Sequence, residues 1–359
     1  MTHTDFQIDT DYLQKQLLQL LAIPSPAGLT AASLDHLSQA LQDLGIQQQS
    51  RTRRGALLAE ISGQEPVLRR ALSAHVDTLG AMVRECKANG RLGILPIGSW
   101  SSRTAEGCRV RIHTASGTVY RGTIMPLKAA AHAFAKEIDS QPVTWDQVEI
   151  RVDADSHSSS DLTHLGLQVG DIVSVDPQSE ILDNGYIVSR FLDDLGGVAC
   201  LLTAVKALRD QGLKPSCSSA LFFSHYEELG HGASLRLPES IEELVSVDIA
   251  IVAEGQNSAE DKVSVVYMDN SGPYDPQLTR QLETLAREQS LPVARDVFRY
   301  YFSDCAAAIQ AGNDVRHALI GFGTDASHSF ERTHLKGLEA TVRLICAYLC
   351  APLHSAAQT

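Results

Sequence analysis

The chain has 359 residues, 44% of them hydrophobic, and a formal net charge of −13. This length and composition exclude a disordered chain and are those of one large α/β domain, or of such a domain with a smaller companion. The acidic balance, spread along the chain, argues against nucleic acid or an anionic membrane as a partner.

Cysteine usage and the first residues indicate the compartment. The seven cysteines are scattered, odd in number and without a C-x-x-C pair, which is typical of reduced thiols in a cytoplasmic protein. The N-terminal stretch "MTHTDFQIDTDYLQKQ" carries acids rather than a basic region followed by an apolar core, so we expect no signal peptide. No apolar run reaches the roughly 20 residues of a membrane span. We therefore expect a cytoplasmic protein with no membrane partner.

The first elements in chain order are two amphipathic helices and two strands. Leucines at helical spacing predict helices over residues 13–21 and 34–44, separated by the breaker "IPSPAG". Apolar runs predict strands over 56–61 and 67–75, and the second strand ends in "SAHVD".

Residues 85–180 have a different texture. Short β-like runs such as "RVRIHT" and "QVEIRVD" are separated by turn signals, and helical periodicity is confined to "LKAAAHAFAKEI". This pattern predicts a small β-rich domain inserted into a larger one, whose two parts would be residues 1–84 and 181–359.

Strands and helices alternate in the remainder of the chain. The patterns predict helices over 195–208, 276–289, 303–312 and 335–349, and strands over 219–224, 247–253 and 317–321. Such alternation predicts an α/β fold with a mostly parallel central sheet covered on both faces.

Five positions at strand ends or helix starts carry His, Asp or Glu. In open α/β sheets, sites form beyond the carboxyl ends of the strands. Taken singly, such residues are more often structural histidines, helix caps or solvated carboxylates, but together they favour a metal site. The residues are His75 with Asp77, Asp193 with Asp194, Glu227 with Glu228, Glu254, and His328.

The spacing within these motifs suits metal-dependent hydrolysis. Residues i and i+2 of an extended chain face the same side, so Asp77 can reach the ring of His75 and fix its tautomer for a metal. Adjacent side chains diverge, so one of Glu227 and Glu228 can bind an ion while the other faces a water. Two imidazoles and three carboxylates suit one or two divalent ions, zinc foremost, with cobalt or manganese as alternatives. Two divalent metal ions bound side by side activate water for amide or phosphate hydrolysis.

Other catalytic motifs fail. His225 and His231 are six residues apart and form neither H-E-x-x-H nor its inverse. The chain has no G-x-S-x-G or Walker loop, and "GFG" at 321–323 is a lone, weak match to a dinucleotide motif.

Five ordered segments resemble the motifs of the tetrahedral (TET) aminopeptidases, which are cobalt- or zinc-dependent glutamyl and deblocking aminopeptidases. They are "AHVDTLGAMVR", "SRFLDDLGGVACLL", "YEELGHGAS", "VDIAIVAEG" and "ASHSFE", and the resemblance covers nearly the whole chain. It implies a phosphorylase/hydrolase-like αβα catalytic domain with an inserted β domain that serves in oligomer assembly, from a dimer up to a dodecamer.

The resemblance also implies a ligand set for two ions. Asp193 would bridge them, His75 and Glu254 would complete one site, and Glu228 and His328 would complete the other. Where the family usually has Asp as the fourth ligand, this reading places Glu254.

Two further roles follow from the same resemblance. Glu227 would be the general base, acting on a water held between the ions, and Asp77 would orient His75. The family often has a cis peptide after the bridging aspartate, here Asp193–Asp194.

The leading function is therefore a two-metal aminopeptidase that hydrolyses N-terminal residues of small peptides. The segments "RYYFSD" and "ERTH" resemble a subgroup associated with the osmolyte N-acetylglutaminylglutamine amide, which would imply a small peptide amide as substrate. The alternative is a metal-dependent amidase or deacylase acting on N-acyl amino acids or dipeptide amides. A non-catalytic binding protein is disfavoured, because no expected ligand position carries an apolar or cationic residue.

Overall fold

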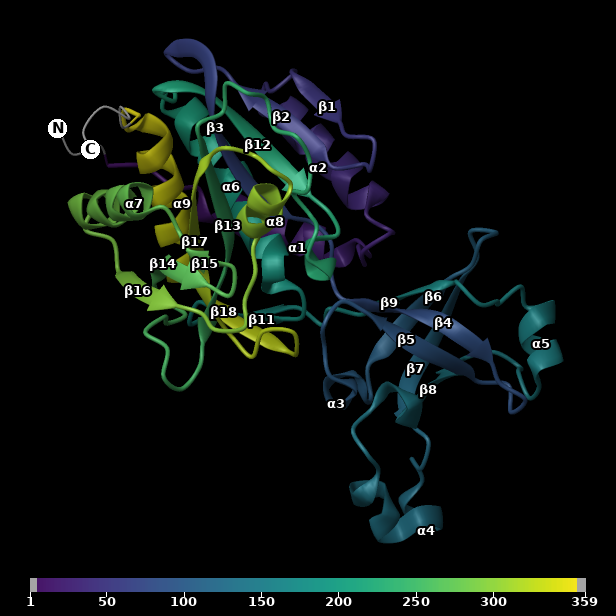
Figure 1. The fold of residues 1–359 in the computed structure, drawn as a ribbon. Coiled ribbons are helices and arrows are strands. Elements are labelled where there is room, and N and C mark those ends of the chain that lie inside the picture. The colour runs from purple at the N-terminus through teal and green to yellow at the C-terminus, as the bar shows by residue number, and fades with distance from the viewer. Residues whose placement is uncertain (1–4, 354–359) are drawn as a thin grey trace.

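A computed structural model describes residues 5–353. The chain forms a large domain built on one sheet and a smaller barrel that projects from it, with a slender arm at the barrel's far end (Figure 1). Among residues 5–353, no helix is both long enough and apolar enough to cross a membrane.

The large domain contains a twelve-stranded mixed sheet. In spatial order its main path is β1 (Gln49–Arg51), β2 (Leu57–Ile61), β12 (Cys217–Ser224), β3 (Glu65–His75), β13 (Glu243–Val252), β17 (Arg316–Asp325), β18 (Glu331–His334), β11 (Tyr186–Ser189) and β10 (Glu180–Ile181). Three more strands extend from β17: β14 (Val263–Asp269), β15 (Gly272–Pro273) and β16 (Val293–Val297). The central strands β12, β3, β13 and β17 run parallel, and the other neighbours on the main path are antiparallel.

Helices cover both faces of this sheet, which gives the predicted αβα architecture. One face shares a single large core with α1 (Thr10–Ala22), α2 (Ala31–Asp43), α6 (Leu192–Asp210), α7 (Pro276–Glu288) and α9 (Leu335–Cys350). The opposite face has a smaller core under α8 (Asp304–Gln310) and the segment that precedes β13.

Side-chain alternation along the central strands decides which residues face each core. In β13, Val247 and Ile249 belong to the large core, whereas Leu244 and Ala250 belong to the smaller one. Because successive side chains of a strand point to opposite faces, Asp248 points away from α6 and toward the smaller core.

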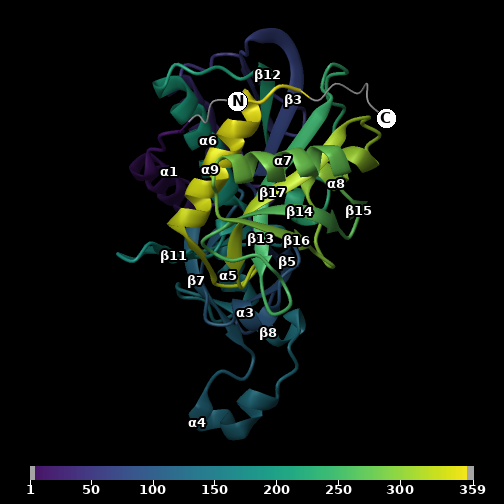
Figure 2. The same ribbon diagram turned by 90° about the vertical axis from the view of Figure 1, so that its left-hand side faces the viewer.

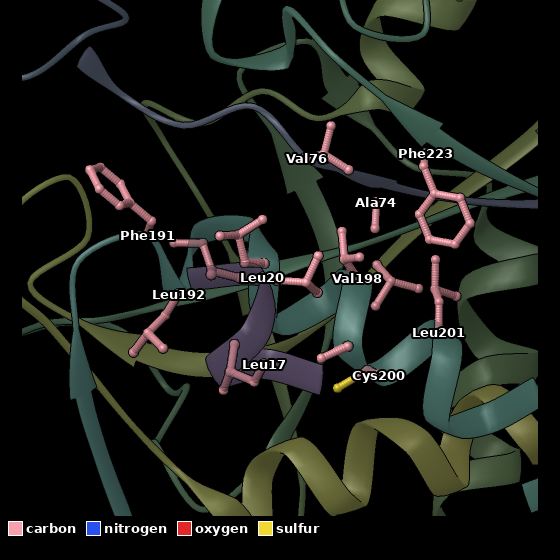
Figure 3. Packing of buried hydrophobic residues seen from close by; sticks show 14 of the residues in the cluster. Leu17, Leu20, Ala74, Val76, Phe191, Leu192, Val198, Cys200, Leu201 and Phe223 are labelled. Atoms are coloured by element: carbon pink, nitrogen blue, oxygen red, sulfur yellow. The ribbon is translucent and has the colours of Figure 1, made fainter. Parts of the chain in front are cut away.

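The large core packs α6 between the sheet and the other helices. Figure 3 shows Val198 and Leu201 of α6, with Leu20 of α1, close to Ala74 and Phe223 at the ends of two central strands. All five side chains are at most 2% exposed, and each buried aliphatic or aromatic side chain contributes roughly 1.5–3 kcal/mol to folding. This packing fixes the strand ends from which the site is built.

The inserted domain is a closed six-stranded barrel. Its strands in spatial order are β4 (Gly80–Cys86), β5 (Leu92–Ile97), β8 (Val148–Val152), β7 (Val119–Pro126), β6 (Arg109–His113) and β9 (Ile172–Val175). Two short helices, α3 (Ser102–Ala105) and α5 (Ser159–His164), lie beside it. The barrel strands thus run from Gly80 to Val175, compared with the expected insertion of 85–180.

An arm projects from the barrel between β7 and β8 (Figures 1 and 2). It contains α4 (Ala131–Phe134) and two 3₁₀ turns, Ala135–Ser140 and Trp145–Gln147, none of which has a buried residue. The helical pattern of "LKAAAHAFAKEI" therefore yields only short helical turns, because an isolated helix gains little without a surface to pack against.

Candidate active site

Three neighbouring parallel strands bring polar side chains to one edge of the sheet. His75 ends β3 and is paired with Ser224, which ends β12. In the next pair, Ser73 of β3 faces Ser246 of β13, so Asp248 lies level with His75. The carboxyl ends of parallel strands are where α/β sheets build their sites.

Asp193 lies between two histidines that come from distant parts of the chain. Its Oδ1 is 3.0 Å from Nε2 of His75, and its Oδ2 is 3.3 Å from Nε2 of His328. The Nε2 of His328 is also 3.3 Å from Oε2 of Glu228. The two oxygens of one carboxylate thus face two different imidazoles, which is the arrangement expected of a bridging ligand.

The second nitrogen of each imidazole contacts a backbone carbonyl. Nδ1 of His75 lies 2.9 Å from the carbonyl oxygen of Asp77, and Nδ1 of His328 lies 2.7 Å from that of Ser99. When each Nδ1 carries the proton it donates to the carbonyl, which leaves Nε2 of both rings free to bind a metal.

Asp77 supports the paired glutamates more directly than it supports His75. Its carboxylate oxygens accept the backbone N–H groups of Glu227 at 3.1 Å and of Glu228 at 3.2 Å. Its Oδ1 is 3.8 Å from Nδ1 of His75, beyond hydrogen-bond distance. The ring of His75 is oriented by the carbonyl of Asp77, whereas the Asp77 side chain holds the loop that carries both glutamates.

Asp194 follows the expected bridging residue across a cis peptide bond and has a different task. Its Oδ1 accepts the N–H of Gly197, and its Oδ2 accepts the N–H of His75. A carboxylate that accepts an N–H three residues ahead acts as a helix cap. Asp193 is thus free to face the histidines, while Asp194 caps the first turn of α6 and ties it to β3.

Glu331 is a buried residue whose role no sequence motif indicated. It begins β18, is 1% exposed, and accepts the N–H of Asp193 at 3.2 Å and the N–H of His328 at 3.0 Å. His328 has a φ of 62°, in the left-handed region. Glu331 therefore fixes the backbone of two expected ligands at once. The motif "ASHSFE" contained it, but nothing in its spacing indicated this contact.

Burial and mutual repulsion raise the pKa values of three carboxylates of the site. Burial raises the pKa of Glu228 to about 8, and it raises the pKa of Asp248 to about 7, in both cases with a contribution from the charge of Asp193. Burial also raises the pKa of Glu227 well above its ordinary value, although His75 opposes the shift. These shifts favour the protonated carboxyl groups when no cation is bound, and a cation would favour the ionised carboxylates.

At the two histidines and at Asp193 the pKa shifts favour the charged form instead: both histidine pKa values rise and that of Asp193 falls. Burial tends to lower the pKa of His328, but the charge of Glu228 and the hydrogen bond to Asp193 outweigh it and raise that pKa to about 11. The pKa of Asp193 falls despite its burial, because His328 and His75 both hydrogen-bond to it. The acidic groups thus stabilise the positive charge of the histidines, and they would stabilise a bound cation for the same reason.

The structure does not bring Glu254 to this cluster. Glu254 lies beyond the end of β13 and is exposed, and it belongs to neither of the groups of convergent ligand atoms found among residues 5–353. Asp248, which is 4% exposed, lies there instead. The hydrogen bonds of β13 to its neighbours end at Val252, so Glu254, two residues farther, lies in the loop beyond the sheet. The available signal was an acidic residue inside the apolar run "LVSVDIAIV".

The donor set fits divalent metal ions. Two groups of side chains have ligand atoms within 4.8 Å of one another: His75 with Asp193 and Glu228, and His75 with Asp194 and Asp248. Oε1 of Glu228 is buried and has no hydrogen-bond partner among the described residues. A buried carboxylate oxygen without a donor is costly unless a cation neutralises it. Imidazole nitrogens with carboxylate oxygens are the ligands of zinc, and they suit cobalt and manganese as well.

A cavity of about 500 Å³ opens onto this cluster. Residues from both domains line it: Pro96, Gly98, Ser99, Asp193, Glu227, Glu228, Leu229, Gly230, Asp248, Tyr300, Tyr301, Phe302 and His328. Gly98 has a φ of +83°, and a Cβ atom there would come within 2.5 Å of Leu79. The barrel therefore contributes one wall of the cavity at a position that only glycine fills without strain.

Comparison with known proteins identifies the family of this chain. A family model described as M42 glutamyl aminopeptidase matches residues 55–344, which is most of the chain. The chain belongs to the M42 aminopeptidase family. It is accordingly a peptide-bond hydrolase, and the expected aminopeptidase activity is confirmed at that level.

Two relatives in sequence differ in how much of this M42 aminopeptidase they cover. "Putative aminopeptidase YhfE" of Bacillus subtilis (strain 168) is 38% identical over 335 residues, 93% of this chain and 96% of the relative. "Lysyl aminopeptidase" of Pyrococcus furiosus is 24% identical over 246 residues, 67% of this chain and 68% of that protein.

Solved structures confirm the fold. The TET aminopeptidase from the marine sediment archaeon Thaumarchaeota archaeon SCGC AB-539-E09 superposes with a TM-score of 0.84 at 18% identity, covering 94% of this chain and 96% of the other. The TET1 peptidase of Pyrococcus horikoshii, which can assemble into a tetrahedron or a large octahedral shell, gives 0.82 at 21% identity, covering 94% and 99%.

Proposed function

We propose that this M42 aminopeptidase removes N-terminal residues from small peptides or peptide amides, with two divalent ions at the edge of the sheet. The observation that carries the proposal is the position of Asp193, whose two oxygens face His75 and His328 at 3.0 and 3.3 Å. In this scheme Asp193 would help to hold both ions, Asp248 and His75 would complete one site, and Glu228 and His328 would complete the other. Asp248 takes the place that the sequence had suggested for Glu254.

Two bound metal ions, with zinc favoured by the ligand set, would supply Lewis acidity that activates a water and polarises the peptide carbonyl. The protein's own contribution is to place the ligands and the proton carrier. Asp77, Asp194 and Glu331 fix the backbone of the ligand segments through the hydrogen bonds described above. Such supporting contacts typically contribute 10–100-fold to metal affinity or activity.

Glu227 is the proposed general base. Its side chain lines the cavity, and its Oε2 lies 3.7 Å from Nε2 of His75. In the reaction it takes a proton from the attacking water and delivers it to the leaving amine. A base works best when its pKa is near the working pH, and burial moves the pKa of Glu227 in that direction.

We also propose that the enzyme is a cytoplasmic homo-oligomer. The assembly described for the TET1 peptidase and the near-complete overlap with it support the oligomer, with the barrel as the element in contact with a second subunit. The seven cysteines are free, which suits a reducing compartment. A monomer in light scattering at micromolar concentration would contradict the assembly.

The function is tested by supplying zinc, cobalt and manganese separately to the metal-stripped enzyme. Each preparation is offered a dipeptide with a free N-terminus, the same dipeptide acetylated, and both as C-terminal amides. We expect cleavage of the free-amine substrates only. Preferential cleavage of the acetylated forms would identify an amidase or deacylase instead, and activity confined to the amides would support a substrate related to the osmolyte amide.

A further inference from the structure

We propose that the cavity walls form an apolar subsite, so that the enzyme prefers peptides whose N-terminal side chain is aromatic or large and aliphatic. This inference rests on the proposed aminopeptidase function and names its substrate class. Its basis is the composition of the cavity lining: the charged lining residues all belong to the proposed metal centre, here called the floor, and the remaining lining residues, here called the walls, carry no charge.

The charged groups lie together on the floor. Every acidic residue and the one histidine that line the cavity belong to the proposed metal centre, and within residues 5–353 no lysine or arginine lines it. The walls consist of Pro96, Gly98 and Ser99 from the barrel, Leu229 and Gly230 after the paired glutamates, and the segment 300–302. A substrate amine and carbonyl that engage the floor would leave the side chain against these walls.

Exposed aromatic residues form one of these walls. Tyr300 is 82% exposed, Phe302 46% and Leu229 44%. Large side chains of this kind that gather around a concave site are typical of ligand pockets, which are lined mainly by apolar groups with a few polar groups that fix orientation.

The aromatic segment is held in place by the residues that alternate with Tyr300 and Phe302. The Tyr301 hydroxyl donates to the carbonyl of Ile249 at 3.1 Å, and the Tyr301 ring packs 5.3 Å from that of Phe298, which is 1% exposed. Ser303 is buried, and its hydroxyl is 2.9 Å from that of Tyr274. Anchoring at these positions presents Tyr300 and Phe302 outward as a fixed surface.

The same walls disfavour a charged N-terminal side chain. A glutamyl carboxylate would find no cationic partner among the wall residues. The nearest arginine in the sequence, Arg299, stacks on the ring of Tyr300 at 5.0 Å and does not line the cavity. Desolvating a charge without a partner is costly, so the preference implied by the family description as a glutamyl aminopeptidase does not follow for this chain.

The test compares kcat/KM for p-nitroanilides of Leu, Phe, Ala, Glu and Lys with the metal-loaded enzyme. We expect Leu and Phe to exceed Ala by on the order of 10–200-fold, the range that extra apolar groups give in a hydrophobic pocket, and Glu and Lys to be poorer still. If Glu or Lys equals or exceeds Leu, the subsite inference is overturned while the aminopeptidase survives. If no substrate is cleaved with any of the three metals, the proposed function itself fails.

Variants locate the preference. Phe302→Ala and Leu229→Ala, from two separate walls, should lower kcat/KM for Leu and Phe at least tenfold and change that for Ala little. Val297→Ala is the control, because Val297 is exposed and lies outside the cavity lining. An equal loss on all substrates in both wall variants would overturn the inference, and a thermal melt of each variant excludes unfolding as the cause.

Discussion

The carboxylate of Asp77 accepts the backbone N–H of Glu227 at 3.1 Å, with its other oxygen on the N–H of Glu228. Asp77, two residues after His75, thus holds the loop that follows the neighbouring strand β12. In this loop the proposed base and one proposed ligand are adjacent in the sequence. Tyr226 and Gly230, at the two ends of this turn, both have positive φ. Asp77 is therefore the contact that keeps a tight turn in register with β3.

Asp77→Asn should impair catalysis more than metal binding. An amide presents an N–H₂ group to a backbone N–H, so one of the two hydrogen bonds is lost and the glutamate loop shifts. We expect kcat to fall by about 10–100-fold with metal content near that of the wild type. Parallel measurement of kcat and of bound metal by elemental analysis checks this, and a large loss of metal with unchanged kcat per bound ion would contradict it.

Asp248 and Glu254 make a matched pair of acidic residues on one strand and its extension. Asp248→Asn removes a buried proposed ligand, so the metal-to-protein ratio should fall from about two toward one. The ion that Asp248 would help to hold should bind at least tenfold more weakly. Glu254→Gln changes an exposed residue outside the cluster and should leave both ratio and activity near wild type. The reverse result would restore Glu254 as the ligand.

Metal binding should release protons and tighten as the pH rises. Without metal, burial raises the pKa of Glu228 to about 8 and that of Asp248 to about 7. Burial opposes the shift at His328, but Glu228 and Asp193 raise its pKa to about 11. These groups carry protons at pH 6 that an ion must displace. Calorimetry in buffers of different ionisation enthalpy should show proton release, with apparent affinity increasing from pH 6 to pH 8. An affinity independent of pH would contradict the assigned ligands.

A second buried polar cluster stabilises the opposite end of the sheet. Arg70 is fully buried, pairs with Glu243 at 3.0 Å, and donates to the carbonyls of Tyr348 and Ala351, each at 2.7 Å, where α9 ends. Arg70→Met should lower the free energy of unfolding by about 3–5 kcal/mol, because it takes the donor from the carbonyls at the end of α9 and removes one of the two arginines that pair with buried Glu243. Arg69→Met, in a half-exposed pair with Glu242, should cost roughly 0–1 kcal/mol. Urea unfolding of both variants measures the difference.

Sequence patterns predicted the elements that bury an apolar face. The helices over 195–208 and 335–349 and the strands over 67–75 and 219–224 correspond to α6, α9, β3 and β12. The four-residue strands β11 and β18 were not predicted, because four residues are too few to show the apolar–polar alternation of a strand. Their pairing places Glu331 opposite Ser189, just before the Asp193 segment, and such long-range contacts leave no mark in local spacing.

The expected site residues that the structure brings together are those that stand directly at a strand end or helix start. His75, Asp193, Glu228 and His328 converge as the motifs suggested, and Glu227 lies beside them. Glu254 failed because the position of the strand's end was misjudged. Asp248 and Glu254 are six residues apart, and an even spacing keeps the same face along a strand, but Asp248 lies within β13 and Glu254 in the loop beyond it.

The central claim is that Glu227 moves the proton while Glu228 holds an ion, and one comparison tests it most directly. Glu227→Gln and Glu228→Gln are each measured for bound metal and for turnover of a free-amine peptide. We expect Glu227→Gln to keep both ions while turnover falls on the order of 10²–10⁴-fold, whereas Glu228→Gln should lose metal together with activity. Substantial turnover by metal-loaded Glu227→Gln would contradict the assignment of the base.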